Sequence, residues 1–181
     1  MAKPPVEVRD LKIGWLTDSL RTQEITGLFL GSVHPDYPSH SDIMEGRAEG
    51  PGHWASDVAT IHARELAGLD LSGGVFRDPG VRLAIAELEG ELLGFAAVAV
   101  VEFDAGRSTP VRFARLDDIV VVPSARGGGL GAALIGWVEE ELRAANVSRL
   151  FLESGIRNTA AHRFFVSHGF DTVSQNFMKE L

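Results

Sequence analysis

The sequence predicts a mixed α/β fold of the α+β type, in which a mostly antiparallel central sheet is flanked by helices. Three observations support this prediction. Residues 81–122 contain three β-like stretches joined by short turns, which is typical of an antiparallel meander. Amphipathic helical patterns occur before and after these stretches. The 181 residues are 45% hydrophobic and 23% charged, which is the composition of a globular chain with a core of normal size.

The amino-terminal part of the chain predicts one strand and two helices separated by a long polar loop. The strand is expected at residues 6–14, and the first helix at residues 17–31, with Thr17 or Asp18 as its N-cap. Gly, Pro, Ser, His and Asp crowd together after residue 31, and a long loop of this kind in a compact domain is usually functional or disordered. A helical period resumes over residues 54–69.

The carboxyl-terminal part supplies most of the predicted sheet. The expected strands cover residues 81–88, 92–103, 111–122, 148–154 and 170–178. The expected helices cover residues 130–145 and 158–167. Asn158 is the natural N-cap of the last helix, and Gly169 is placed to end it. The predicted order is β-α-α-β-β-β-α-β-α-β, within one domain that spans residues 1–181.

Charge and cysteine content exclude several functions. Lys and Arg number 17 against 25 Asp and Glu, and the net charge of −8 at pH 7 argues against a nucleic-acid partner. The chain has no Cys, which excludes disulfides, thiolate metal sites and a Cys nucleophile. No apolar run approaches the roughly 20 residues that cross a bilayer, and the first residues lack a signal-peptide core. We therefore expect a cytoplasmic protein without a membrane partner.

A glycine-rich loop between a valine-rich strand and a helix is the clearest candidate site. Its residues are Arg126, Gly127, Gly128, Gly129, Leu130, Gly131 and Ala132. Glycines allow backbone N–H groups to approach an anion closely, and the helix N-terminus adds the positive end of its dipole. The sequence therefore predicts a phosphate site.

Three classes of ligand compete for this loop, beside a turn without a ligand. A Walker P-loop is excluded because Ala132 and Ala133 follow where Lys and Ser or Thr are required. A dinucleotide-binding loop matches G-x-G-x-x-A at Gly127, Gly129 and Ala132. Against it, residues 123–126 separate the strand from the first glycine, and only about 50 residues remain for the rest of a parallel sheet. A coenzyme A loop and a turn without a ligand remain open.

The loop and the helix that follows it resemble the GNAT superfamily of N-acetyltransferases. Arg126, Gly129 and Gly131 match the family pattern Arg/Gln-x-x-Gly-x-Gly/Ala. A second family motif, an Asn-led helix that ends in Gly-Phe, is met at the right spacing by Asn158, Ala161, Gly169 and Phe170. The resemblance covers about residues 81–181. It implies an enzyme that moves an acetyl group from acetyl-CoA to a small-molecule amine.

The resemblance also implies which residues hold the coenzyme. The N–H groups of residues 126–132 would bind the pyrophosphate, and Val120, Val121 and Val122 would pair with the pantetheine arm as an added strand does. The N–H of Val120 would stabilise the developing oxyanion. Asn158 would contact the pantetheine, although a simple helix cap is an equal alternative. Phe165 would line the same site, where the family usually has a Tyr that protonates the thiolate.

The acceptor amine requires a base. With a pKa near 10.4, about one Lys-like amine in 2,500 is neutral at pH 7. Asp117 and Asp118 lie on the strand that leads to the thioester, and adjacent strand residues face opposite ways, so one of them should face the acceptor. The pair is similar to the acidic pair of spermidine/spermine acetyltransferases. The glutamate that the family often uses as a base maps onto Arg115, which cannot act as a base. Asp117 is favoured as the base because regular alternation places it on the same face as Arg115. The alternative is that both are ordinary strand residues, either solvated or ion-paired.

The resemblance also implies that the polar loop at about residues 31–54 borders the acceptor, with His34 and Tyr37 as substrate-binding residues. A plain surface loop is the alternative. A metal is not expected there, because no His or Asp pair has the spacing of helical metal ligands. Two other functions stay open: a non-catalytic acyl-CoA-binding module, and a protein N-acetyltransferase. A homodimer is equally left open.

Overall fold

The computed structural model describes residues 11–72, 80–103, 106 and 111–181. Contacts group the chain into two compact units, of which the first contains Met1–Val33 and Ala59–Leu152. The second contains His34–Val58 and Glu153–Leu181. The expected single domain therefore stays a prediction. The start of the first predicted strand and nearly all of the turn at residues 104–110 lie outside the described residues.

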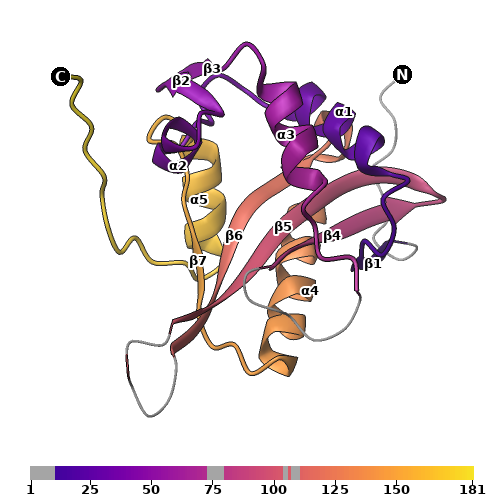
Figure 1. The fold of residues 1–181 in the computed structure, drawn as a ribbon. Helices are drawn as coiled ribbons and strands as arrows, with labels where there is room; N and C mark the ends of the chain where they lie inside the picture. The colour runs from indigo at the N-terminus through magenta and orange to yellow at the C-terminus, as the bar shows by residue number, and fades with distance from the viewer. Residues whose placement is uncertain (1–10, 73–79, 104–105, 107–110) are drawn as a thin grey trace. The chain divides into compact units, whose positions relative to one another are not determined.

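A five-stranded sheet forms the base of the first unit (Figure 1). In spatial order its strands are β1 (Lys12–Trp15), β4 (Gly80–Leu88), β5 (Glu91–Phe103), β6 (Val111–Val121) and β7 (Leu150–Leu152). All neighbouring pairs are antiparallel except β6 and β7, which are parallel. The predicted mixed, mostly antiparallel sheet is confirmed.

The turn between β4 and β5 fixes the register of the meander. Glu89 and Gly90 have φ values of 52° and 84°, and they join the paired residues Leu88 and Glu91. Two consecutive residues with positive φ match the right-handed twist of a two-residue hairpin. The short turn predicted between these two strands is thus present.

Helices cover both faces of this sheet. The helices of the first unit are α1 (Thr22–Ser32), α3 (Val58–Leu66) and α4 (Leu130–Ala144), with a short 3-10 helix, η2 (Pro123–Ala125). On one face α1 and α3 meet, where Phe29 stacks on His62 at 4.2 Å, and the His62 ring lies 6.1 Å from Phe95 of β5. On the other face α4 packs against Gly94, where an added Cβ would lie 3.3 Å from Leu134 Cδ1 (Figure 1). Because both faces are covered, most of β5 is buried.

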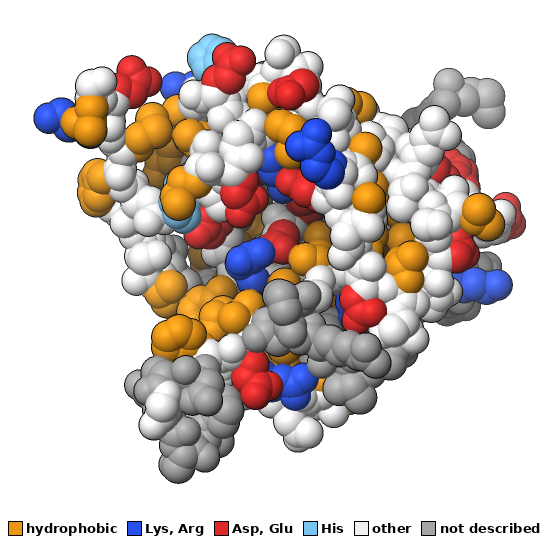
Figure 2. Space-filling view, viewed as in Figure 1, with side chains coloured by type: hydrophobic (Ala, Val, Ile, Leu, Met, Phe, Trp, Pro, Cys, Tyr) orange, Lys and Arg blue, Asp and Glu red, His pale blue; other side chains and the backbone are white. Residues whose placement is uncertain are grey.

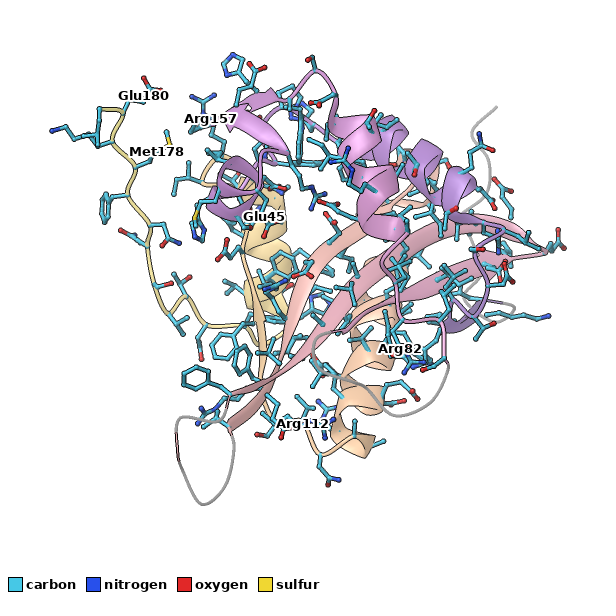
Figure 3. All side chains as sticks on the ribbon, viewed as in Figure 1. Glu45, Arg82, Arg112, Arg157, Met178 and Glu180 are labelled. Atoms are coloured by element: carbon cyan, nitrogen blue, oxygen red, sulfur yellow. The ribbon has the colours of Figure 1, made fainter. Side chains whose placement is uncertain are left out.

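A buried cation lies between β4, β1 and α4. Arg82, which is labelled in Figure 3, comes from β4 and is 3% exposed. Its guanidinium carbon lies 4.5 Å from the Trp15 ring centre. Burial lowers the pKa of Arg82, and the carboxylates of Asp70 and Glu141 oppose this shift. The Trp15 indole N–H also donates to Glu141 at 2.9 Å. These contacts join the edge strand to the helix.

The second unit contains more regular structure than the sequence predicted. Its elements are α2 (His40–Met44), β2 (Ala48–Gly50), β3 (His53–Trp54) and α5 (Thr159–Ser167). A capping box starts α2: Ser39 accepts the N–H of Asp42, whose carboxylate accepts the N–H of Ser39. The Asn158 side chain accepts the N–H of Ala161 at 3.2 Å, which confirms it as the N-cap of α5.

The largest differences from the prediction concern the starts of two helices and the final strand. The first helix begins at Thr22, because Asp18 accepts the N–H of Leu20 at 2.9 Å in a preceding turn. The second expected helix starts at Val58, since Trp54 belongs to β3. The final strand at residues 170–178 was wrong: these residues are irregular, and residues 171–181 are exposed. A strand needs a neighbour to satisfy its backbone, and no described strand pairs with this segment.

Candidate active site

The glycine loop leads from η2 into α4 with a backbone that only glycine adopts easily. Gly127 and Gly129 have φ values of 76° and 86°, in the left-handed region. A Cβ added at either position would meet no atom within 4 Å, so open space adjoins both residues. The loop therefore presents its backbone to that space without covering side chains at these two positions.

The first turn of α4 supplies unused donors. Ala133 is the first residue whose N–H reaches back within the helix, to Gly129 O at 2.9 Å. The N–H groups of Leu130, Gly131 and Ala132 consequently have no acceptor inside α4. Together with the helix dipole, they form a site suited to an anion. Arg126 departs from the prediction, because its N–H donates to Pro123 O at 3.4 Å and closes η2.

One edge of β6 is open beside this loop. Strand β7 pairs with β6 only at residues 114–116, and no other described strand occupies that side further along. Val122 donates its N–H to Leu93 O at 2.9 Å, and inward and outward backbone groups alternate along an antiparallel strand. The N–H of Val120 therefore points toward β5, whereas those of Ile119 and Val121 point to the open edge. This corrects the expectation that Val120 supplies the oxyanion donor.

A β-bulge in β6 places the two candidate carboxylates. Asp118 pairs with Ala97 while Leu116 pairs with Val98, so Asp117 is the extra residue. The expected alternation of Asp117 and Asp118 between faces is therefore wrong. Arg115, opposite Ala99, and Asp118, opposite Ala97, lie on one face of the strand.

Asp117, the inserted residue, contacts Arg115 on this face through its side chain. Both carboxylate oxygens of Asp117 accept from the Arg115 guanidinium, with Nη2 and Oδ2 3.2 Å apart. The Asp117 side chain is 22% exposed and that of Arg115 is 51% exposed. The face is the one on which Phe95 meets His62 of α3. Arg115, Asp117 and Asp118 thus form one charged cluster on β6.

The other predicted residues belong to the second unit. His34 Nδ1 accepts the N–H of Asp36 at 3.2 Å, and the His34 ring lies 5.6 Å from that of Tyr37. Phe165 is 8% exposed and packs against Phe170, with ring centres 5.6 Å apart. His34 and Tyr37 therefore come together, and Asn158 serves as a cap, as found above. Roles for these residues in binding stay predictions.

Sequence reasoning missed Ile119 and the side chain of Arg126, described below. The bulge did leave a signal in the sequence. Apolar residues of β6 recur with a period of two at Ala114 and Leu116, and then with shifted phase at Ile119 and Val121. A phase shift across two adjacent acidic residues indicates one inserted residue. This phase shift predicts that the N–H groups of Ile119 and Val121 point outward.

The visible face carries many acidic side chains, in keeping with the net charge of −8 (Figure 2). Among the residues that the structure describes, no group of three or more His, Asp or Glu could hold a metal ion. No helix in the described ranges is long and apolar enough to cross a membrane.

Known proteins are similar to this chain in sequence and in fold. The chain is 30% identical over 104 residues to an aminoalkylphosphonate N-acetyltransferase of Salmonella typhimurium, covering 58% of this chain and 66% of the relative. It is 32% identical over 122 residues to an aminoglycoside N(6')-acetyltransferase of Klebsiella aerogenes, covering 67% and 78%. A solved aminoglycoside N-acetyltransferase in complex with CoA matches the fold with a TM-score of 0.59 and 18% identity, covering 94% of each chain.

The family model described as acetyltransferase (GNAT) family matches residues 46–170. This range includes the open edge of β6, the glycine loop and the Asn158-capped helix. The resemblance predicted from the two motifs is confirmed. The chain belongs to the GNAT acetyltransferase family.

Proposed function

We propose that the protein transfers an acetyl group from acetyl-CoA to a small-molecule amine. The observation that supports this most strongly is the continuity of two backbone surfaces: the open edge of β6 and the donor-rich loop before α4. One surface suits an extended arm with amides, and the other suits a pyrophosphate. Coenzyme A contains both groups in this order.

The coenzyme binds mainly through backbone atoms. The N–H groups of residues 127–132 donate to the pyrophosphate, and the pantetheine arm extends along β6 as an additional strand. The alternation of the ladder assigns the outward N–H groups of Ile119 and Val121 to this arm. Ile119 lies nearer the charged cluster, so its N–H is the donor to the thioester oxygen.

Acetyl transfer then needs three events at this end of β6. The neutral amine attacks the thioester carbonyl, a C–N bond forms, and negative charge collects on the oxygen. The N–H of Ile119 stabilises that charge. When the intermediate collapses, the C–S bond breaks, coenzyme A leaves as a thiolate, and the attacking nitrogen loses its remaining extra proton to solvent.

Asp118 removes the proton from the acceptor ammonium. Asp117 and Asp118 lie on one strand face, and the Arg115 guanidinium donates to both oxygens of Asp117. Asp118 lies in the regular ladder opposite Ala97 and directly precedes Ile119, whose N–H we assign to the thioester oxygen, so it is the carboxylate nearer the reacting carbonyl along β6. Asp117 therefore orients the cluster together with Arg115. This replaces the prediction that Asp117 is the base.

The departing thiolate is protonated by solvent. Phe165 cannot donate a proton, whereas the family commonly has Tyr at this helix position. A thiol pKa near 8.5 lies about 1.5 units above neutrality, which corresponds to roughly 2 kcal/mol. Solvent can meet this modest requirement.

The acceptor is a cationic amine of small size. The two relatives named above act on an aminoalkylphosphonate and an aminoglycoside, and both types of molecule carry a primary amine. The excess of acidic residues in this chain suits a cationic partner. His34 and Tyr37, which form a tilted aromatic pair, are the residues that we assign to its binding.

A non-catalytic acyl-CoA-binding module is the second candidate. It is favoured by Arg115 and Phe165, which stand where the family often has Glu and Tyr. The two functions differ in turnover but not in coenzyme binding.

The test measures thiol release from acetyl-CoA with a panel of aminoalkylphosphonates, aminoglycosides, polyamines and amino acids. Acetyl transfer to one of these classes supports the proposal, and the Asp118→Asn variant serves as the matched inactive control. Tight acetyl-CoA binding without turnover on any amine would favour the module. Absence of acetyl-CoA binding would contradict both functions.

A further inference from the structure

The side chain of Arg126 reaches back from the glycine loop and joins two elements of the first unit. Its Nε donates to Val121 O at 3.0 Å, and its Nη2 donates to Ser32 O at 2.9 Å. Val121 is the last residue of β6, and Ser32 is the last residue of α1. The Arg126 guanidinium therefore links the end of β6 to the end of α1.

The Val121 carbonyl lies on the open edge of β6. Val121 is opposite Gly94 in a pair that does not exchange ladder hydrogen bonds, because the adjacent pair of Val122 and Leu93 does. Its C=O and N–H therefore both point away from β5. A pantetheine arm added along this edge would need that carbonyl as the acceptor for one of its amide N–H groups.

We propose that Arg126 is a latch that occupies the pantetheine site and is displaced when the coenzyme binds. The guanidinium N–H stands where the pantetheine amide N–H must be. Since its two hydrogen bonds are made by one planar group, rotation away from Val121 also strains or breaks the bond to Ser32. This inference rests on the proposed coenzyme site.

Displacement of the latch has a consequence for α1. Ser32 O is one of the last carbonyls of the helix, which have no intrahelical donor and rely on other partners. When Arg126 leaves, the last turn of α1 loses that partner. The chain continues from there into residues 34–54, the segment expected to bind the acceptor. Arg126 thus couples coenzyme binding to the start of that segment.

The test compares two ligands by calorimetric titration. Acetyl-CoA fills both surfaces, whereas 3′-phosphoadenosine 5′-diphosphate, its nucleotide part, reaches only the loop. Charge effects of Arg126 act on both ligands, so the ratio of their dissociation constants isolates competition at Val121. In Arg126→Met the preference for acetyl-CoA over the nucleotide should rise about tenfold, as expected for removal of one competing charged hydrogen bond.

Two controls accompany this variant. Arg126→Lys keeps the charge but cannot bridge both carbonyls, and its ratio should lie between those of Arg126→Met and the wild type. Arg143→Met removes a cation that pairs with Glu139 on α4, and it should leave the ratio unchanged. An unchanged or lower ratio in Arg126→Met overturns the latch alone. If the wild type binds no acetyl-CoA, the proposed function itself fails.

A measurement on the wild type covers the case in which Arg126→Met does not fold. The N–H of Val33 donates to Phe29 O at 3.0 Å in the last turn of α1. Its hydrogen exchange should become at least about tenfold faster with acetyl-CoA than with the nucleotide. Equal or slower exchange with acetyl-CoA would overturn the latch.

Discussion

The two ends of the proposed site on β6 work in different ways. In the function that we propose, backbone groups contact the coenzyme from Ile119 to the glycine loop, and side chains matter chiefly by their absence. From Arg115 to Asp118 the proposal assigns the chemistry to side chains, and the backbone matters through one inserted residue. A site made of backbone groups can therefore be predicted directly from glycines in the sequence. A site made of side chains depends on the strand register, which is set by packing.

The largest expected effect is at the side-chain end. Asp118→Asn should lower kcat/KM about 10²- to 10⁴-fold at pH 7, the usual range for loss of a general base. The deficit should shrink as pH rises toward the acceptor pKa, because the free amine then forms unaided. A pH–rate profile of the variant beside the wild type measures this.

Asp117→Asn is the matched comparison for that profile. It removes the partner of Arg115 without removing the base, so its loss should be smaller and nearly independent of pH. If the two profiles are interchanged, Asp117 is the base and the assignment of Asp118 is wrong.

At the backbone end, Gly129→Val should weaken acetyl-CoA binding about 100-fold, equivalent to roughly 2.7 kcal/mol. A Cβ at φ 86° would stand in the open space before the donors. Gly90→Val is the control, because Gly90 has φ 84° and open surroundings but lies in the β4–β5 turn. It should cost similar backbone strain and leave the dissociation constant unchanged. Equal loss in both variants would remove the loop from the site.

The sequence predicted these two ends unequally. Gly127 and Gly129 were assigned to an anion site, and both have the left-handed backbone that such a loop requires. For Asp117 and Asp118, regular alternation predicts that only Asp117 shares the face of Arg115, whereas the inserted residue places Asp118 on that face as well. Strand register results from contacts with β5, which a local pattern records only as a phase shift. The final strand at residues 170–178 failed for a related reason, because strand formation needs a partner that propensity does not supply.

A smaller effect concerns the packing between β5 and β6 at Gly94. In Gly94→Ala the new Cβ would lie 2.6 Å from Val120 O, a backbone atom that cannot move freely. The free energy of unfolding should fall by about 1–3 kcal/mol. The control Gly136→Ala lies within α4 with no atom near its Cβ and should raise it by up to about 1 kcal/mol. Denaturant titration distinguishes them, and a neutral Gly94→Ala would mean that β5 and β6 are farther apart than described.

The smallest effect lies away from both ends. Trp15→Phe removes the indole N–H that donates to Glu141 at 2.9 Å. It should lower the free energy of unfolding by about 1 kcal/mol, the net value of one hydrogen bond. Acetyl-CoA affinity should stay constant in the same preparation. A change in affinity would indicate that the edge strand affects the site.

Residue-resolved amide hydrogen exchange, with and without acetyl-CoA, tests the assignment of backbone groups along β6 most directly. Val120 should exchange slowly in both states, because its N–H lies in the ladder with β5. Ile119 and Val121 should exchange fast in the free protein and become protected when acetyl-CoA binds. If Val120 is instead the amide that gains protection while Ile119 and Val121 do not change, the register of β6 and the site built on it are wrong.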